Sequence, residues 1–176
     1  MKMTPRMLCC AALVVTGLVL CSLPGCGKPP LPDTVPVAGT VTYQGAPLEG
    51  ATVTFRNTSI AALDAGGLAM GTTDAEGKFV VQSHFGPTDV AEGVVPGEYR
   101  VTVSKFIPPN GMSEEEYQQK LAEEEKIMEA EGAIPPDKET PPQVEMLPAK
   151  YSSSQESTLT ATIADEGDTA MSFDLE

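Results

Sequence analysis

The feature that most constrains the fold of this chain is an alternation of apolar residues over residues 37–81. Apolar side chains recur at every second position in VAGTVTY, in TVTF and again in GKFVV. Gly, Pro and Asp separate these runs, as in QGAPLEGA and TTDAEGK. A period of two places apolar side chains on one face of a strand, and the separating residues favour turns. The stretch therefore predicts successive strands joined by turns.

The same alternation continues further along the chain, in residues 99–103, 159–163 and 171–175. Val95-Pro96-Gly97-Glu98, just before the first of these, fits a type II turn, because Pro presets φ and Gly supplies a positive φ. In total about seven strands are expected, each with one apolar face, which is typical of a two-sheet antiparallel β-sandwich. The predicted fold class is all-β.

The N-terminal segment has the order of a secretory signal. A basic head, MKMTPR, precedes an apolar run over residues 7–23, and Pro24-Gly25-Cys26 follows. A basic head, an apolar middle and small residues at the end are typical of a signal peptide. A retained membrane helix is the alternative, because the run is near the lower length limit for a span. Pro24 and Gly25 end the run, and no basic cluster follows it.

The end of this segment, Leu23-Pro24-Gly25-Cys26, resembles the lipobox of bacterial lipoprotein signals. The resemblance implies that residues 1–25 are removed and that Cys26 becomes the first mature residue, with lipid on its sulfur and amino group. Several acyl chains on one residue give a lasting membrane anchor. Gly27 in place of Asp after the lipidated residue favours the outer membrane of the cell envelope. Cys26 is therefore the expected lipidation site.

Two further parts follow the signal. Residues 26–36, which include KPPLPDTVP, are expected to form a stiff Pro-rich tether, and residues 37–176 to form the sandwich domain. Cys9, Cys10 and Cys21 lie in the signal, so the mature chain is expected to have Cys26 as its one cysteine and no internal disulfide.

Three motifs carry a family resemblance: GTVTYQGAPLEGATVTF, GTTDAEGKFVV and VPGEYRVTVSK. Together they resemble the carboxypeptidase regulatory-like domain, which has a transthyretin-type (prealbumin-like) sandwich. The likeness covers residues 37–105. The later PAKYSSSQESTLTATI and SFDLE are similar to the closing strands of small bacterial lipoproteins of this kind. In the carboxypeptidases this domain accompanies a zinc catalytic domain, for which this sequence leaves no room.

The pattern changes over residues 107–149, where an acidic helical arm is expected before the last two strands. Ser113 and Glu116 form a capping box, and Gly132 suits the position after a helix that ends at Glu131. Prolines isolate this helix on both sides. Its apolar residues are few: Tyr117, Leu121, Ile127 and Met128. Two interpretations remain open, a helix over residues 113–132 that binds a partner with a basic surface, and a solvated insertion.

The charge of the chain excludes one class of partner. With 11 basic and 25 acidic residues the net charge is −14. Such a surface repels the phosphates of nucleic acids, so nucleic-acid binding is excluded. The absence of Trp also disfavours a stacking platform for sugars or bases.

No residue set predicts catalysis, a cofactor or a metal. His84 is the one histidine, and it is expected to be a loop residue rather than a base. Asp74, Glu76 and Gly77 resemble part of a calcium loop, but most of that pattern is missing. A type I turn explains Asp74 and Gly77 without a metal. No Gly-x-Ser-x-Gly motif or Ser-His-Asp set is present.

The sequence thus favours a lipid-anchored envelope protein with a non-enzymatic structural or protein-binding role. Binding is expected through the 113–132 helix or through loops, and the oligomeric state stays open. The alternative is a carbohydrate-binding or adhesion module that uses exposed loops such as residues 57–70. A hydrolase with an unrecognised site is a further alternative.

Overall fold

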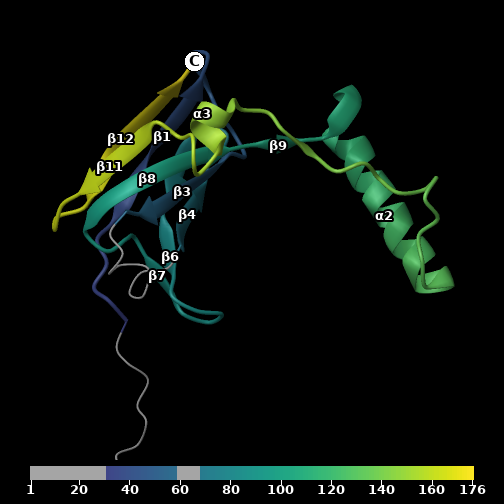
Figure 1. The fold of residues 1–176 in the computed structure, drawn as a ribbon, viewed down its shortest axis with the longest axis horizontal. Helices are drawn as coiled ribbons and strands as arrows, with labels where there is room; N and C mark the ends of the chain where they lie inside the picture. Colours follow the sequence, from purple (N-terminus) through teal and green to yellow (C-terminus); the bar gives the residue numbers. More distant parts are fainter. Residues whose placement is uncertain (1–30, 59–67) are drawn as a thin grey trace, which may run out of the picture. The chain divides into compact units, whose positions relative to one another are not determined.

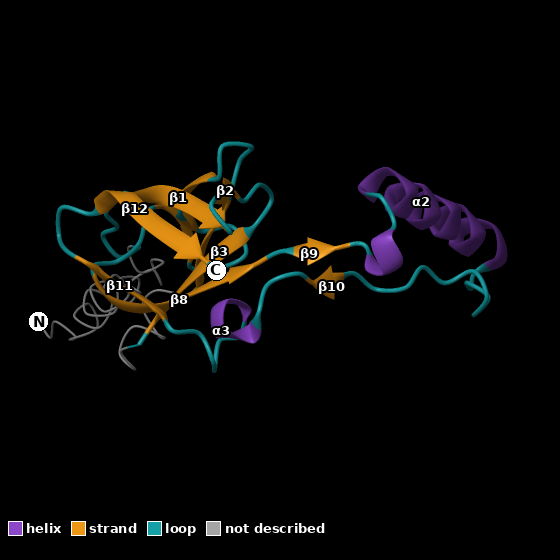
Figure 2. Cartoon of the chain, turned by 90° about the horizontal axis from the view of Figure 1, so that it is seen from above, coloured by secondary structure: helices purple, strands orange, loops and turns teal. Residues whose placement is uncertain are grey.

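The computed structural model describes residues 31–58 and 68–176, which belong to one compact unit that begins at Leu31. This part of the chain is mostly β-structure with one long helix, as the sequence predicts. Two sheets share one hydrophobic core in a β-sandwich-like arrangement, and an arm extends from them (Figures 1 and 2).

The two sheets differ in size. The larger has six strands in the order β11-β8-β3-β4-β6-β7, and the smaller has β1 between β12 on one side and β2 and β5 on the other. The strands of the larger sheet are β3 (Thr52–Asn57), β4 (Leu68–Thr72), β6 (Gln82–His84), β7 (Val90–Glu92), β8 (Gly97–Ser104) and β11 (Leu159–Ile163). Those of the smaller are β1 (Val37–Tyr43), β2 (Ala46–Pro47), β5 (Lys78–Val80) and β12 (Asp168–Leu175).

One strand pair departs from the expected antiparallel pattern. β1 and β12 are parallel, with Val41 opposite Phe173 and Tyr43 opposite Leu175, whereas the other strand pairs within the described residues are antiparallel. The reason lies in the turn before β12. The chain reverses there, but β11 and β12 enter different sheets, so β12 lies beside β1 and runs in the same direction.

The core confirms the alternation read from the sequence. Val41, Val53, Phe55, Val101 and Val103 are fully buried. The partly buried members that pack against the core include the predicted Tyr43, Leu159, Ala161 and Met171. Apolar residues outside the alternating runs complete it: Leu48, Ala51, Ala69, Val94, Leu147 and Tyr151.

Of the two turn types predicted from the sequence, the one at residues 74–77 is present and the one at residues 95–98 is not. Gly77 has a φ of 74°, and its N–H donates to the Asp74 carbonyl at 2.9 Å, as expected for the predicted turn. Gly97 has a φ of 154°, far from the value near 80° of a type II turn, so the prediction for residues 95–98 is wrong. Gly97 is instead the first residue of β8.

The segment before β1 contacts the sandwich. Val35 and Val94 form an isolated antiparallel bridge, in which each N–H donates to the carbonyl of the other residue. The Thr34 hydroxyl donates to the Glu92 carbonyl at 2.8 Å. The last residues of the segment expected to be a tether are thus bound to the chain around Glu92 and Val94.

The arm begins where β8 ends. A short antiparallel ribbon of β9 (Phe106–Ile107) and β10 (Val144–Glu145) leads to the 3-10 turn η1 (Pro109–Gly111) and to α2 (Glu114–Glu131). Figure 2 shows α2 at the far end of this ribbon rather than against a sheet. After the ribbon, α3 (Ala149–Ser152) packs on β8. The helix precedes the last two strands, as predicted.

Candidate functional site

A hollow of the sandwich lies where the chain changes sheets. β5 pairs with β1 in the smaller sheet, and β6 pairs with β4 in the larger, so the change falls at the buried Val81. The Val81 N–H donates to the Val37 carbonyl at 2.9 Å, and its own carbonyl accepts from the Gly93 N–H at 2.7 Å. Val81 is therefore bonded to β1 of the smaller sheet and to the residue after β7 of the larger sheet.

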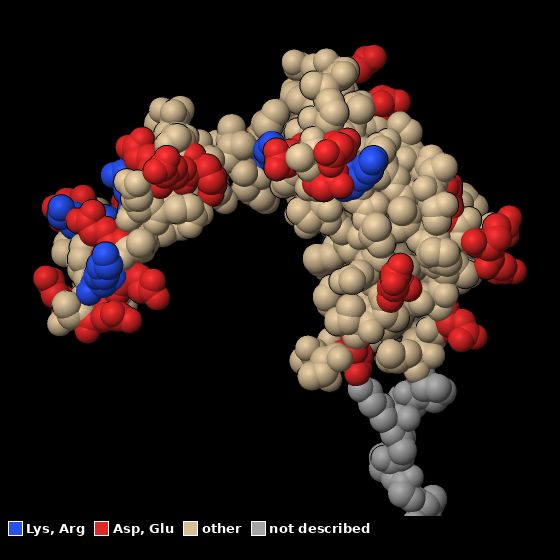
Figure 3. Space-filling view, turned by 180° about the vertical axis from the view of Figure 1, so that it is seen from behind, with Lys and Arg blue, Asp and Glu red and all other residues tan. Residues whose placement is uncertain are grey.

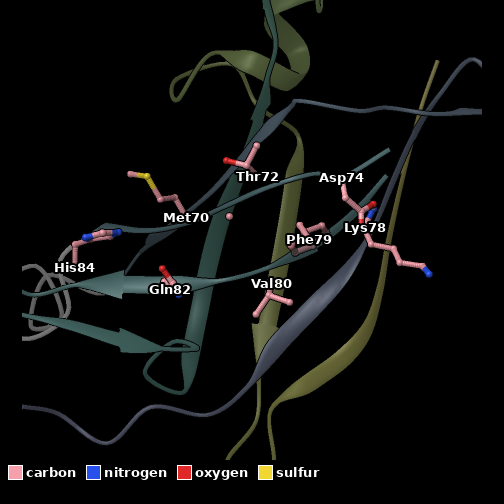
Figure 4. Close-up of a pocket in the computed structure, with 9 residues that line it drawn as sticks. Met70, Thr72, Asp74, Lys78, Phe79, Val80, Gln82 and His84 are labelled. Carbon is pink, nitrogen blue, oxygen red and sulfur yellow. The ribbon is translucent and has the colours of Figure 1, made fainter. Parts of the chain in front are cut away.

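The hollow measures about 670 Å³. Its lining comes from β4, β5, β6 and the turn before β5: Met70, Gly71, Thr72, Asp74, Lys78, Phe79, Val80, Gln82 and His84. Figure 4 shows His84 at one end and Asp74 with Lys78 at the other, with Val80 and Gln82 between them. We call this hollow the sheet-switch groove.

Glycine shapes the sheet-switch groove at one point. A Cβ built on Gly71 would lie under 3.0 Å from the Val80 carbonyl oxygen. Only a residue without a side chain lets β4 approach β5 this closely. The backbone of the two strands therefore meets at the floor of the groove.

The polar side chains that line the sheet-switch groove are Thr72, Asp74, Lys78, Gln82 and His84. The Asp74 carboxylate accepts from the backbone N–H groups of Glu76 and Lys78, at 3.0 and 2.8 Å. These bonds hold the turn, as the sequence predicts. The one aromatic residue of the sheet-switch groove, Phe79, is buried and offers no ring face for stacking on a sugar. His84 lies on β6, not in the loop that the sequence predicts.

Two negative findings concern the described residues alone. Within residues 31–58 and 68–176, no group of three or more His, Cys, Asp or Glu is placed to hold a metal ion. No helix in the same part of the chain is both long and apolar enough to span a membrane.

The arm helix has the ends that the sequence predicts. The Ser113 hydroxyl accepts from the Glu116 N–H at 3.2 Å. Gly132 has a φ of 74°, and its N–H donates to the Met128 carbonyl at 2.9 Å. Tyr117 is the one buried residue of α2. Acidic side chains dominate its surface, as the gathering of Asp and Glu on the arm in Figure 3 shows.

Two titratable side chains, Lys150 and Tyr151, lie next to each other on α3. The Tyr151 hydroxyl donates to the carbonyl of Glu176 at 3.2 Å and accepts from the N–H of the same residue at 3.0 Å. A hydrogen bond with the Lys150 ammonium lowers the pKa of Tyr151, and the same bond raises the pKa of Lys150. Tyr151 thereby ties the end of β12 to α3.

Tyr99 makes the stability of the fold depend on pH in the alkaline range. Burial raises the pKa of Tyr99 above its ordinary value of 10.0, against a smaller lowering by the Asn57 side chain. Its hydroxyl donates to the Val95 carbonyl. The folded protein therefore holds this proton more tightly than the unfolded chain does. The resulting stabilisation is complete below pH 10.0 and is lost as the pH rises from there through the folded pKa.

We expect Tyr99→Phe to flatten this pH dependence. The variant should lose about 0.5–1.5 kcal/mol at neutral pH, because the hydrogen bond to Val95 is gone. Its free energy of unfolding should then fall less than that of the wild type at alkaline pH. Urea titrations at neutral pH and on either side of pH 10.0 measure both effects. If the free energy of unfolding falls equally with pH in the variant and in the wild type, Tyr99 is not the group that causes the pH dependence.

Several predicted features lie outside the described residues. The signal over residues 1–25 and the lipidation site Cys26 are among them. The loop expected as a binding surface, residues 57–70, is described only at its ends, because Asn57 belongs to β3 and Leu68 begins β4. The middle of that loop, residues 59–67, is not described.

Sequence reasoning missed the sheet-switch groove and found the arm. The groove collects residues from separate strands, and no motif links them. One signal was present in the run from Lys78 to His84, which alternates without a turn although its two halves enter different sheets. The arm, in contrast, has local capping signals at both ends.

Comparisons with protein-family models, with curated proteins and with solved structures gave no match for this chain.

Proposed function

We propose that this protein is a lipid-anchored protein of the cell envelope with a non-enzymatic, protein-binding role. The observation that carries the proposal is the arm. An 18-residue helix lies at the end of a two-stranded ribbon with one buried residue. A helix placed in this way adds little to the sandwich core, and its surface is open to a partner. The sandwich is then the support that positions the arm.

The proposed location of the protein at the outer membrane is inferred from its sequence. The basic head, the apolar run over residues 7–23 and Cys26 support a lipoprotein signal, and Gly27 supports the outer membrane. We further propose that the sandwich is of the carboxypeptidase regulatory-like, transthyretin type. The three motifs over residues 37–105 support this assignment.

The anchor is tested by mass spectrometry of the protein extracted from membranes. A mature chain that starts at an acylated Cys26 is the expected result. Cys26→Ser is the matched control and should shift the protein from the membrane to the soluble fraction. A mature chain that starts at another residue would refute the anchor.

The binding role is tested by crosslinking in the native envelope followed by affinity purification. Two proteins are compared, the full-length chain and a variant in which a Gly-Ser linker replaces residues 113–132. We expect at least one crosslinked partner to disappear with the helix, while the Tyr99 and Phe55 core keeps the variant folded. Identical partners for both proteins would remove the arm from the function.

A further inference from the structure

The helix of the arm has two unlike sides, and the chain itself covers one of them. The Glu124 carboxylate accepts from the Thr140 N–H, so the returning segment after the helix is bound to this side. A hollow of about 140 Å³ lies between Lys120 and Glu123 of α2 and residues 137–139 of that segment. This side of α2 is therefore occupied within the arm.

Two large apolar side chains lie next to this contact, within about 60° of Glu124 around the helix, and stay exposed. Leu121 is 36% exposed and Met128 is 46% exposed. They are seven residues apart, which places them about two turns apart on the same side of the helix. Burying such side chains in a partner is favourable, at roughly 25 cal/mol per Å² of apolar surface.

The charges around this pair have one sign. Glu125 lies between Leu121 and Met128, four residues after the first and three before the second. Glu114 lies seven residues before Leu121, about two turns away on the same side of the helix. Lys120 lines the hollow on the covered side. Lys126 lies about 160° around the helix from Met128. Both lysines of α2 thus lie about 80° or more around the helix from the apolar pair, whereas Glu124 and Glu125 are its direct neighbours.

This pattern decides between three kinds of partner. A second copy of the same helix would bring like charges together, which costs free energy. Anionic lipid headgroups are repelled for the same reason. A polypeptide with apolar side chains flanked by Lys and Arg satisfies both the apolar pair and the carboxylates.

We propose that the side of α2 formed by Leu121, Glu125 and Met128, with Glu114 beside it, binds a basic amphipathic segment of another protein. We call this side the acidic docking face. The inference rests on the proposed protein-binding function and adds the face and the chemistry of its partner.

The test uses the full-length protein in mild detergent and three synthetic helical peptides. The first peptide has Leu along one side with Lys and Arg next to it. The second has Glu in place of Lys and Arg, and the third has Ser in place of Leu. Fluorescence anisotropy measures the affinity of each at low and at high salt. We expect the first peptide to bind most tightly, and its affinity to fall with salt because charges contribute to binding.

Variants of the protein locate the binding surface. The double variant Leu121→Ser/Met128→Ser should weaken binding of the first peptide about tenfold or more, because the apolar anchors are lost. Gln119→Ser/Ala130→Ser changes two exposed residues on the opposite side of α2 and should leave the affinity unchanged. Far-UV circular dichroism verifies that both variants keep the helix.

Each outcome separates this inference from the function on which it rests. Loss of binding on replacement of residues 113–132, together with unchanged binding by Leu121→Ser/Met128→Ser, would refute the face and leave the binding arm. Equal binding after replacement of the helix would refute both. A preference for the Glu peptide would refute the basic partner. Dimerisation that disappears in the double variant, measured by analytical ultracentrifugation, would make a second copy the occupant and refute the proposal.

Discussion

Phe55→Ala should lower the free energy of unfolding by about 3–5 kcal/mol, the range for removal of a large buried side chain. Phe55 is fully buried in β3. Its ring centroid lies 6.3 Å from that of Phe79, 6.0 Å from that of Tyr99 and 6.4 Å from that of Phe173. These rings come from both sheets, so the substitution leaves a cavity at the contact between the layers.

The size of this effect is large against the whole stability of a domain, which is commonly about 5–15 kcal/mol. Urea unfolding followed by circular dichroism measures it. Arg56→Ala is the matched control, because Arg56 is the next residue of β3 and is exposed; its cost should stay within about 0.5 kcal/mol. A loss below about 1 kcal/mol for Phe55→Ala would mean that the core collapses around the cavity or that Phe55 is not central to it.

Gly93→Ala should cost roughly 2–5 kcal/mol, because two unfavourable terms coincide. Gly93 has a φ of 84°, which costs about 1–2 kcal/mol for a residue with a Cβ. A Cβ there would also lie under 3.0 Å from the Val35 carbonyl oxygen, and overpacking of this kind costs about 1–3 kcal/mol. The bridge between Val35 and Val94 should therefore open in the variant.

A matched glycine separates the two terms. Gly50 has a φ of 69°, and a Cβ built on it meets nothing within 4 Å. Gly50→Ala should thus lower the free energy of unfolding by about 1–2 kcal/mol, because only the unfavourable positive φ contributes. Urea unfolding measures both variants, and hydrogen exchange at the Val35 amide reports the bridge. If the two variants lose the same stability, the close approach of Val35 to Gly93 contributes nothing.

The layers of the fold were predictable because strand alternation is a local property. Val53 and Phe55 point inward, whereas Arg56 points outward, and the order of residues alone determines this. The parallel contact between β1 and β12 was not predictable, because it depends on which sheet each strand enters after a turn. The sequence around Gly167 specifies a reversal, but not the sheet in which the next strand pairs.

The arm shows the same division between local and long-range information. Ser113 and Gly132 determine the ends of α2 through bonds to their own neighbours, so the sequence predicts the helix to the residue. The position of the helix depends on the pairing of β9 with β10, two short strands separated by the whole arm. Of the candidate sites, the sheet-switch groove has residues from separate strands, and for that reason no local pattern predicts it.

The parallel contact of β1 with β12 determines how the domain bears tension. Val37 lies beside Asp168 at one end of the pair, and Tyr43 lies beside Leu175 at the other. A pull applied at Val37 and at Glu176 therefore acts in opposite directions along two neighbouring strands. Such a load shears the hydrogen bonds between Gly39–Tyr43 and Met171–Leu175 together rather than opening them one after another. The strand pairing thus makes these two points the mechanically resistant ends of the sandwich.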